Sequence, residues 1–407
     1  MVMANNNENK VLNVPNLRFS EFTGEWKAEQ LNDIAKLTKG AGISKEQLSE
    51  NGESCILYGE LYTKYKSEII DEVLSKTDIP TDKLIRSKAN DVIIPSSGET
   101  AVDIATARCV SSDDILLGGD LNIIRLSHHD GSFMSYQLNG KRKYDIAKVA
   151  QGVSVVHLYG EHLKGIVTYN PGLDEQKKIV RLLSMLDERI ATQNKIIKDL
   201  KKLKSAIVDY TFANHTKVDR KQILLSDIST KITRKNIDNR ISNVLSNSAN
   251  QGVIPQSGVF NREIANEDNI SNYFVISNND FVYNPRKSVT APYGPINKYN
   301  GELEGVISPL YLCFRTHDIN VDYLAWYFKS RSWYEYVYKN GDSGVRHDRV
   351  SIKDDVFFLM PLNIHSTMEQ RKIANRLNKI ELFVRQEKQC LSLLQSQKNF
   401  LLQQMFI

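Results

Sequence analysis

The chain has 407 residues, of which 41% are hydrophobic and 25% are charged, and this composition is typical of a globular protein with two or more domains. It has no run of about 18 apolar residues, and its polar start, MVMANNNENK, has no signal-peptide core, so we expect a cytoplasmic protein without a membrane span. Four isolated cysteines argue against a zinc or disulfide framework, and a net charge of +5 permits nucleic-acid binding without establishing it.

The first part of the chain is predicted to alternate short strands with helices. Strands are expected at DVIIP (91–95), LNIIRL (121–126) and GIVTYN (165–170), because these runs are short and rich in β-branched residues. The stretch SYQLNGKRKYDIAKVAQG (135–152) is helix-like. We therefore expect an α/β unit.

A long amphipathic helix is predicted next, from Asp174. Its apolar residues recur in steps of four, three, four, seven, three and seven, which fits a heptad seam. The stretch has about 40 residues, so the helix would be roughly 60 Å long. Gln193 and Lys204 are its polar seam positions. The apolar seam consists of Ile179, Leu183, Leu186, Ile190, Ile197, Leu200 and Ile207.

The second part of the chain repeats this plan. Strands are expected at DFVYN (280–284), LYLCF (310–314) and DVFFLM (355–360), and one helix at 321–339. A second long helix from Met368 aligns without a gap to the first, 194 positions earlier, with Glu387 and Lys398 at its polar seam positions. Its apolar seam consists of Ile373, Leu377, Ile380, Val384, Leu391, Leu394 and Leu401.

The repeat extends beyond the long helices. LNDIAKLTKG at Leu31 matches LSDISTKITRK at Leu225, and NDVIIPSSG at Asn90 is similar to NDFVYNPRKS at Asn279. The plan is therefore unit, long helix, unit, long helix, and each apolar seam finds a candidate partner in the other copy. The alternative is two unrelated helices on separate domains, which the matching polar interruptions disfavour.

Motifs of several enzyme classes are absent from the sequence. Amino-methyltransferases hold their target with an amide or acidic residue that is followed by Pro-Pro and an aromatic residue, and this motif does not occur. No glycine-rich nucleotide fingerprint follows a strand. His157 and His162 have no carboxylate at metal-ligand spacing, so we interpret them as ordinary residues and expect no metal site. We find no nucleophile–base pair, and we expect no catalysis by this chain alone.

Several loops combine basic, amide, hydroxyl and aromatic side chains, as nucleic-acid interfaces do. Any single loop could equally be a solvated turn, and composition does not separate phosphate contacts from base contacts. In the first unit the candidates are Lys39, Ser44, Tyr58, Tyr62, Lys64, Ser96, Ser97, Thr100, Lys141, Arg142 and Lys143. In the second unit they are Arg234, Lys235, Asn236, Arg286, Lys287, Tyr293, Ser343, Arg346, His347 and Arg349.

The arrangement resembles the specificity subunit of Type I restriction–modification enzymes. The resemblance is carried by the opening VPNLRFSEFTGEWKAEQLNDIAKLTKG, by GVRHDRVSI, and by the two EQ(K/R)KI helices that run to Phe212 and Phe406. It implies two duplicated α/β target recognition domains separated by an antiparallel two-helix coiled coil. The chain would consist of a disordered lead-in (1–14), a first recognition domain (15–172), a central helix (173–213), a second recognition domain (214–364) and a C-terminal helix (365–407).

The resemblance also implies function and partners. Each domain would read one half of a bipartite double-stranded DNA target for two modification subunits, which methylate adenine, and for restriction subunits. S-adenosylmethionine, ATP and Mg would be bound by those partners. A standalone two-domain DNA-binding regulator and a coiled-coil protein scaffold are the alternatives. The second unit lacks a counterpart of Trp26, and this leaves the unit boundaries open.

Overall fold

The computed structural model describes residues 2–3, 12–213, 220–256, 267–341 and 348–407. The chain forms two compact units: the first combines residues 1–195 with 389–407, and the second comprises residues 196–388. In the expected lead-in, Val2–Met3 (β1) pairs with Leu17–Arg18 (β2), and residues 1 and 4–11 lie outside the described residues. Within the described ranges, no helix has both the length and the apolar character that a membrane crossing requires.

The first unit contains two five-stranded sheets. Val92 and Ile94 of the strand Asp91–Pro95 pack against helices, while Ile93 packs toward the second sheet. Because both faces are covered, the whole strand is buried and apolar residues do not alternate with polar ones. The first sheet has the order β4 (Ala35–Lys39), β14 (Leu121–Leu126), β10 (Asp91–Pro95), β12 (Arg108–Val110), β7 (Ile69–Ile70). The second has the order β5 (Leu48–Ser49), β8 (Ser75–Thr77), β6 (Glu53–Ile56), β13 (Leu116–Leu117), β9 (Ile85–Arg86).

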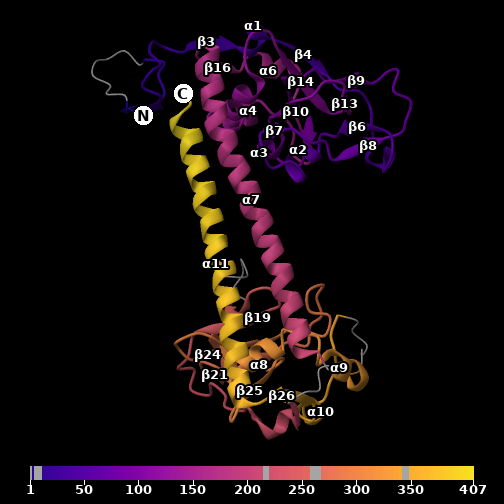
Figure 1. Cartoon of the computed structure of the whole chain (residues 1–407), viewed down its shortest axis with the longest axis vertical. Helices are drawn as coiled ribbons and strands as arrows, with labels where there is room; N and C mark the ends of the chain where they lie inside the picture. Colours follow the sequence, from indigo (N-terminus) through magenta and orange to yellow (C-terminus); the bar gives the residue numbers. More distant parts are fainter. Residues whose placement is uncertain (1, 4–11, 214–219, 257–266, 342–347) are drawn as a thin grey trace. The chain divides into compact units, whose positions relative to one another are not determined.

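Short helices and strand pairs complete the first unit (Figure 1). The strand pairs are β3 (Lys27–Gln30) with β16 (Val167–Asn170), and β11 (Ser97–Gly98) with β15 (Val156–His157). The helices are α1 (Leu31–Ile34), η1 (Lys45–Gln47), α2 (Glu60–Thr63), α3 (Ala101–Ile104), α4 (Gly131–Asn139), α5 (Lys143–Lys148) and α6 (Gly160–Lys164).

The second unit has two four-stranded sheets with the same layering. Phe281 and Tyr283 pack in an aromatic core with helices, while Val282 between them packs toward the other sheet. The sheet orders are β18 (Ser229–Lys231), β25 (Leu312–Thr316), β22 (Phe281–Tyr283), β23 (Ile296–Lys298), and β20 (Gly252–Pro255), β19 (Val244–Ser248), β24 (Gly305–Ile307), β21 (Phe274–Ile276). β17 (Arg220–Leu224) pairs with β26 (Pro361–His365), and the short helices are η2 (Leu225–Asp227), η4 (Glu267–Asn272), α8 (Val321–Tyr327), α9 (Tyr334–Asn340) and α10 (Asp354–Phe358).

The two units share their topology, so the repeat seen in the sequence is also a repeat of fold. The antiparallel run β4-β14-β10 corresponds to β18-β25-β22. The run β8-β6-β13-β9 corresponds to β20-β19-β24-β21, and in both the middle pair is parallel while the outer pairs are antiparallel. A parallel pair at the same place in both sheets makes independent origins for the two units improbable.

Two repeated motifs have a structural explanation. In the motif ND, the asparagine has a positive φ of 80° in one unit and 71° in the other, a backbone conformation that asparagine tolerates well. The aspartate after it, Asp91 or Asp280, is 1% exposed and pairs at 2.7 Å with Arg125 or Arg315. In each unit this pair ties the turn before the central strand to the neighbouring strand.

The EQ(K/R)KI motif contains a buried glutamine that has the same role in each unit. The Oε1 of Gln176 accepts from the N–H of Asp130 (2.9 Å), and that of Gln370 accepts from the N–H of Asn320 (3.0 Å). The Nε2 of each donates to the carbonyl five residues earlier, at 2.8 Å and 2.9 Å. Since Asp130 and Asn320 cap α4 and α8, the motif joins the start of a long helix to the start of a short one.

The long helices α7 (Leu173–Phe212) and α11 (Thr367–Gln404) contribute to both units (Figure 1). In the first unit the start of α7 packs against the end of α11, where Leu183 shares a core with Leu401. In the second unit the end of α7 packs against the start of α11, where Val208 shares a core with Ile373. The helices are therefore antiparallel in each unit, and every apolar seam residue named above is buried or half-buried.

Both seam lysines form ion pairs across the two helices. Lys398 lies 2.5 Å from Asp187 of α7 and also bonds Glu68, and Lys204 lies 2.5 Å from Glu381 of α11. The lysines are 194 positions apart in the sequence, and so are the two carboxylates. The α7–α11 contact in each unit thus carries an equivalent ion pair, with the roles of the two helices exchanged.

The helix predicted over 321–339 is divided, as is the helix-like stretch 135–152. Gly140 ends α4, and a Cβ at this glycine would lie 3.1 Å from the carbonyl oxygen of Tyr136. In the second unit, the Ser330 hydroxyl donates to the Tyr327 carbonyl at 2.7 Å and so competes with the helical hydrogen bonds between α8 and α9. Helical periodicity alone does not reveal such interruptions.

The strand predicted at 355–360 is wrong, because the structure has the helix α10 at Asp354–Phe358. Asp354 and Asp355 lie in its first turn, where carboxylates favour a helix N-terminus. Phe357 is fully buried in the aromatic core. A short apolar run cannot be assigned to strand or helix by periodicity alone, and here the flanking acidic residues favour the helix.

Candidate nucleic-acid interface

Loops from both sheets of the first unit meet at one edge, which we call the first loop edge. The N–H of Gly40 donates to the carbonyl of Leu121 at 3.0 Å, and the N–H of Leu158 donates to that of Ser96 at 2.9 Å. Ala41 bonds the Leu117 carbonyl at 3.0 Å in the same way. These bonds bring together the loops 39–44, 96–100, 117–121 and 157–160.

Four predicted residues lie on or beside this edge with different exposures. Lys39 is exposed at the end of β4, and its Nζ lies 5.8 Å from the centroid of the Tyr159 ring. Ser44 is exposed and caps η1, whereas Ser96 and Ser97 are buried. The two buried serines therefore shape the edge but do not present their hydroxyls on its surface.

Tyr58, Tyr62 and Lys64 lie in or beside α2, and Thr100 ends the loop 96–100 at the start of α3. Both tyrosines are half-buried. The pKa of Tyr62 is raised, mainly by burial and to a smaller extent by the nearby Tyr58 and acidic groups. Lys64 pairs with Glu60 at 2.5 Å, and Thr100 caps α3. Lys64 and Thr100 thus have structural roles that loop composition did not reveal.

The predicted basic run 141–143 is engaged inside the first unit. Arg142 donates to the carbonyl of Ile407 at 2.7 Å and lies 3.1 Å from Asp145. Lys141 and Lys143 are half-buried, and burial lowers the pKa of Lys143. Arg142 is therefore engaged within the unit, and none of the three side chains is fully exposed.

In the second unit, the predicted run 234–236 is also committed to internal contacts. Arg234 lies 2.7 Å from Glu304, and Lys235 donates to Asn272 at 3.2 Å. Asn236 is 1% exposed and bonds both backbone groups of Ile241. Asn236 therefore closes a turn and presents nothing to a ligand.

Four further candidates of the second unit lie at or beside the loop after β22: Arg286, Lys287, Tyr293 and Arg349. Arg286 is exposed and forms a backbone bridge with the half-buried Arg349. Lys287 is half-buried, and its N–H donates to the Asp348 carbonyl at 2.8 Å. Tyr293 packs on Tyr334 with ring centroids 5.0 Å apart. The remaining predicted residues, Ser343, Arg346 and His347, lie outside the described residues.

Two residues of the first loop edge were not among the predicted binding residues. Tyr159 is 45% exposed, and its ring stacks on that of His157 at a centroid distance of 6.2 Å. His157 was predicted to be an ordinary residue because it has no carboxylate at metal-ligand spacing, a criterion that does not test for a binding surface. Histidine and tyrosine alternating after a short strand, in HLYGEH, are a signal for this surface.

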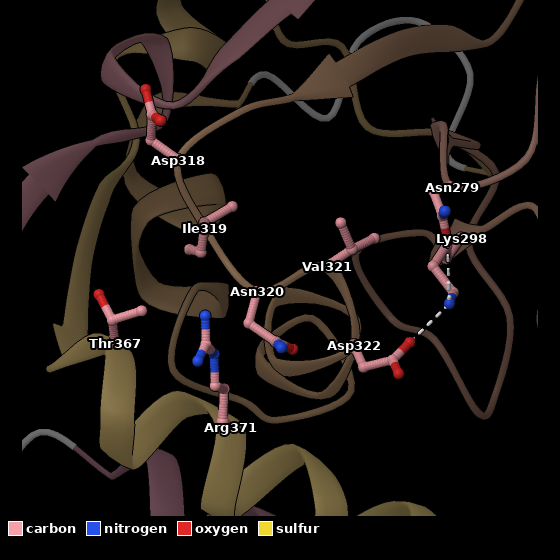
Figure 2. A pocket seen from close by; sticks show the side chains of 9 residues that line it. All are labelled: Asn279, Lys298, Asp318, Ile319, Asn320, Val321, Asp322, Thr367 and Arg371. Carbon is pink, nitrogen blue, oxygen red and sulfur yellow. Dashed lines mark hydrogen bonds and ion pairs between the residues drawn. The ribbon is translucent and has the colours of Figure 1, made fainter.

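Each unit also has a cavity at the start of a long helix. Figure 2 shows a cavity of about 820 Å³ in the second unit, where Thr367 and Arg371 at the start of α11 lie across from the segment 318–322. Lys298 in its wall bonds Asp322 at 2.6 Å. A cavity of about 570 Å³ lies at the start of α7 in the first unit and is lined by Glu29, His129 and Gln176, among others. Neither cavity contains a predicted DNA-binding residue.

Both regions of candidates present polar, charged and aromatic side chains. Among the residues that the structure describes, no group of three or more histidine, cysteine, aspartate or glutamate side chains could hold a metal ion. What these surfaces offer is cations, amides, hydroxyls and aromatic rings. These groups contact phosphates and base edges non-covalently.

Comparisons with known proteins agree on one family. A model of the Type I restriction modification DNA specificity domain matches residues 23–202. The Type I restriction enzyme MjaVIII specificity subunit of Methanocaldococcus jannaschii is 27% identical over 190 residues. That alignment spans 46% of this chain and 42% of the relative, which is less than half of the relative's length.

Solved structures extend the likeness over the chain. The S subunit of a Type I restriction-modification system from M. genitalium has a TM-score of 0.57 at 15% identity, with 97% of this chain and 99% of that chain covered. A chain from a study of complex assembly in a type I R-M system has a TM-score of 0.56, also at 15% identity, with 93% and 96% covered. Residues 23–202 are therefore similar to the Type I restriction modification DNA specificity domain, and the chain has the fold of the Type I specificity subunits.

Proposed function

We propose that this chain is the DNA-recognition subunit of a Type I restriction–modification complex. Each unit would read one half of a bipartite double-stranded DNA target. The observation that carries the proposal is the duplicated topology, together with the match of the first copy to a DNA specificity domain. Two copies of one reader on one chain are suited to a target with two separate halves.

The chemistry would belong to partner subunits in the cytoplasm. Two modification subunits would methylate adenine with S-adenosylmethionine, and restriction subunits would use ATP and Mg. This chain would contribute no catalytic residue. Its recognition domains would correspond to residues 15–172 and 214–364, with the long helices between and after them.

The experiment is an exchange of residues 15–172 for the corresponding unit of another specificity subunit. The chimera and the parent are each produced with the modification subunit, and methylated sites are mapped by sequencing the host genome. We expect one half of the methylated site to change and the other to stay. A chimera that changes both halves of the methylated site, or neither half, contradicts the proposal that each unit reads its own half. Methylation that proceeds without this chain contradicts its role.

A further inference from the structure

An antiparallel pairing, which we call the ribbon, occupies the same place in both units, as two short strands in the first and as an isolated bridge in the second. In the first unit, Ser97 of β11 pairs antiparallel with His157 of β15, and in the second unit Arg286 pairs antiparallel with Arg349. The flanking hydrogen bond is the same in each: the residue after His157 or Arg349 donates its N–H to the residue before Ser97 or Arg286, at 2.9 Å. Arg286 thus takes the place of Ser97, and Arg349 takes the place of His157.

The paired residues of the ribbon differ between the two units, whereas the structure that supports the ribbon is the same. Each ribbon follows the central strand that begins with the buried aspartate, Asp91 or Asp280, and its paired arginine. On this shared support, one unit has a buried serine opposite an exposed histidine, and the other has two arginines. Two domains that read different DNA sequences would differ at positions where the side chains change while the supporting structure stays the same.

The arginine pair is electrostatically unfavourable on its own. Like charges directly opposite each other on paired strands destabilise the pairing. The counter-charge beside Arg286 is Asp348, whose Oδ2 lies 3.7 Å from the Nε of Arg286, and both side chains are more than half exposed. Such an exposed ion pair contributes little. The Nε of Arg349 is buried and has no hydrogen-bond partner among the described residues.

We propose that Arg286 and Arg349 read guanine in the half-site of the second unit, an inference that rests on the proposed function. The planar guanidinium donates two parallel hydrogen bonds to the O6 and N7 of guanine in the major groove. Binding supplies acceptors for both arginines and so relieves their mutual repulsion. In the first unit, the same place presents His157 beside Tyr159 and Lys39, so that half-site is read by different chemistry.

The test uses the full chain in complex with its modification subunit. Arg286→Ala and Arg349→Ala are compared with Arg240→Ala, a matched control in the same unit whose arginine is 83% exposed and pairs with Asp238 at 2.7 Å. Methylated sites are sequenced, and binding to duplexes with single base changes is titrated at several salt concentrations. We expect discrimination for guanine to fall roughly 5- to 150-fold at positions in one half-site only.

Arg→Lys variants at both positions separate base reading from charge and from folding. Lysine keeps the positive charge but lacks the planar fork, so we expect these variants to lose guanine discrimination while the salt dependence is retained. Uniform weakening across all sequences, with a shallower salt slope, would indicate phosphate contacts and overturn the inference. So would behaviour indistinguishable from that of Arg240→Ala. If the parent complex itself binds no bipartite site, the proposed function fails, which is a separate result.

Discussion

At the scale of single residues, the glutamine of the EQ(K/R)KI motif is the clearest case of a repeated side chain with a repeated role. Gln370 satisfies the backbone at the start of α8 and at the end of β26, and it is 3% exposed. We expect Gln370→Ala to lower the free energy of unfolding by about 1–3 kcal/mol, because two buried backbone groups lose their partner. Chemical denaturation measures this loss.

The matched control for this prediction is Gln386→Ala on the same helix. Gln386 is exposed, so its truncation is expected to change the free energy of unfolding by less than about 0.5 kcal/mol. Gln176→Ala should repeat the effect in the first unit, where Gln176 is fully buried. Equal losses for Gln370→Ala and Gln386→Ala would show that the bonds at α8 contribute nothing.

His365 gives a prediction on pH. Burial, and then the neighbouring Arg220, lower the pKa of His365. Its Nε2 accepts from the Nε–H of Arg220 at 3.2 Å, which requires a neutral imidazole. A lowered folded-state pKa means that the unfolded chain binds the proton more tightly, so stability is lost as pH falls from the ordinary histidine value of about 6.5 through the folded pKa.

We therefore expect the second unit to be destabilised between pH 7 and pH 5, and His365→Gln to reduce this dependence. Thermal unfolding at both pH values measures the difference between variant and parent. His317→Gln is the control, because His317 is exposed and lies in the same unit. A parent chain whose loss of stability is the same with and without His365 would contradict the prediction.

At the scale of elements, the two seam lysines offer a comparison within one chain. Lys398 is 11% exposed beside Asp187 and Glu68, whereas Lys204 is 24% exposed beside the 38% exposed Glu381. Burial raises the pKa of Glu68, so its charge already depends on the lysine. Lys398→Met leaves two buried carboxylates without their cation, and we expect it to cost about 3–5 kcal/mol.

Lys204→Met serves as the matched control and should cost at most about 1 kcal/mol, because solvent screens the exposed partner. Denaturant titration of both variants measures the difference between the two sites. Asp187→Asn combined with Lys398→Met should recover part of the loss if the unpaired carboxylates cause it. Equal costs at Lys398 and Lys204 would mean that burial of the pair does not matter.

The elements also show what sequence could and could not predict. The long helices and their seams were predictable because a heptad pattern is local and extends over many turns. The helix α10 was missed because a six-residue apolar run has too few periods to decide. The binding candidates were harder still: Arg234 meets Glu304, and Arg142 meets Ile407, far away in the chain. A basic residue in a loop gives no sign of such a distant partner.

At the scale of the whole molecule, the internal duplication was more informative about function than any single motif. Comparison of the two copies separates the parts that both units share from the parts that vary. The shared parts are the buried aspartate–arginine pairs, the bridging glutamines and the seam ion pairs. The varying parts are the ribbons and loops. The family resemblance alone does not give this division, because it implies that loops contact DNA without indicating which of their residues do so.

The shared parts also predict how many partner subunits bind. A modification subunit that recognises features common to both units finds two equivalent surfaces on one chain, as closed two-fold assemblies do. We therefore expect two modification subunits per chain when that subunit is in excess. Native mass spectrometry of the purified complex measures the ratio directly. A ratio of one to one at saturation would mean that the partner contacts parts in which the units differ, such as Trp26, which the second unit lacks.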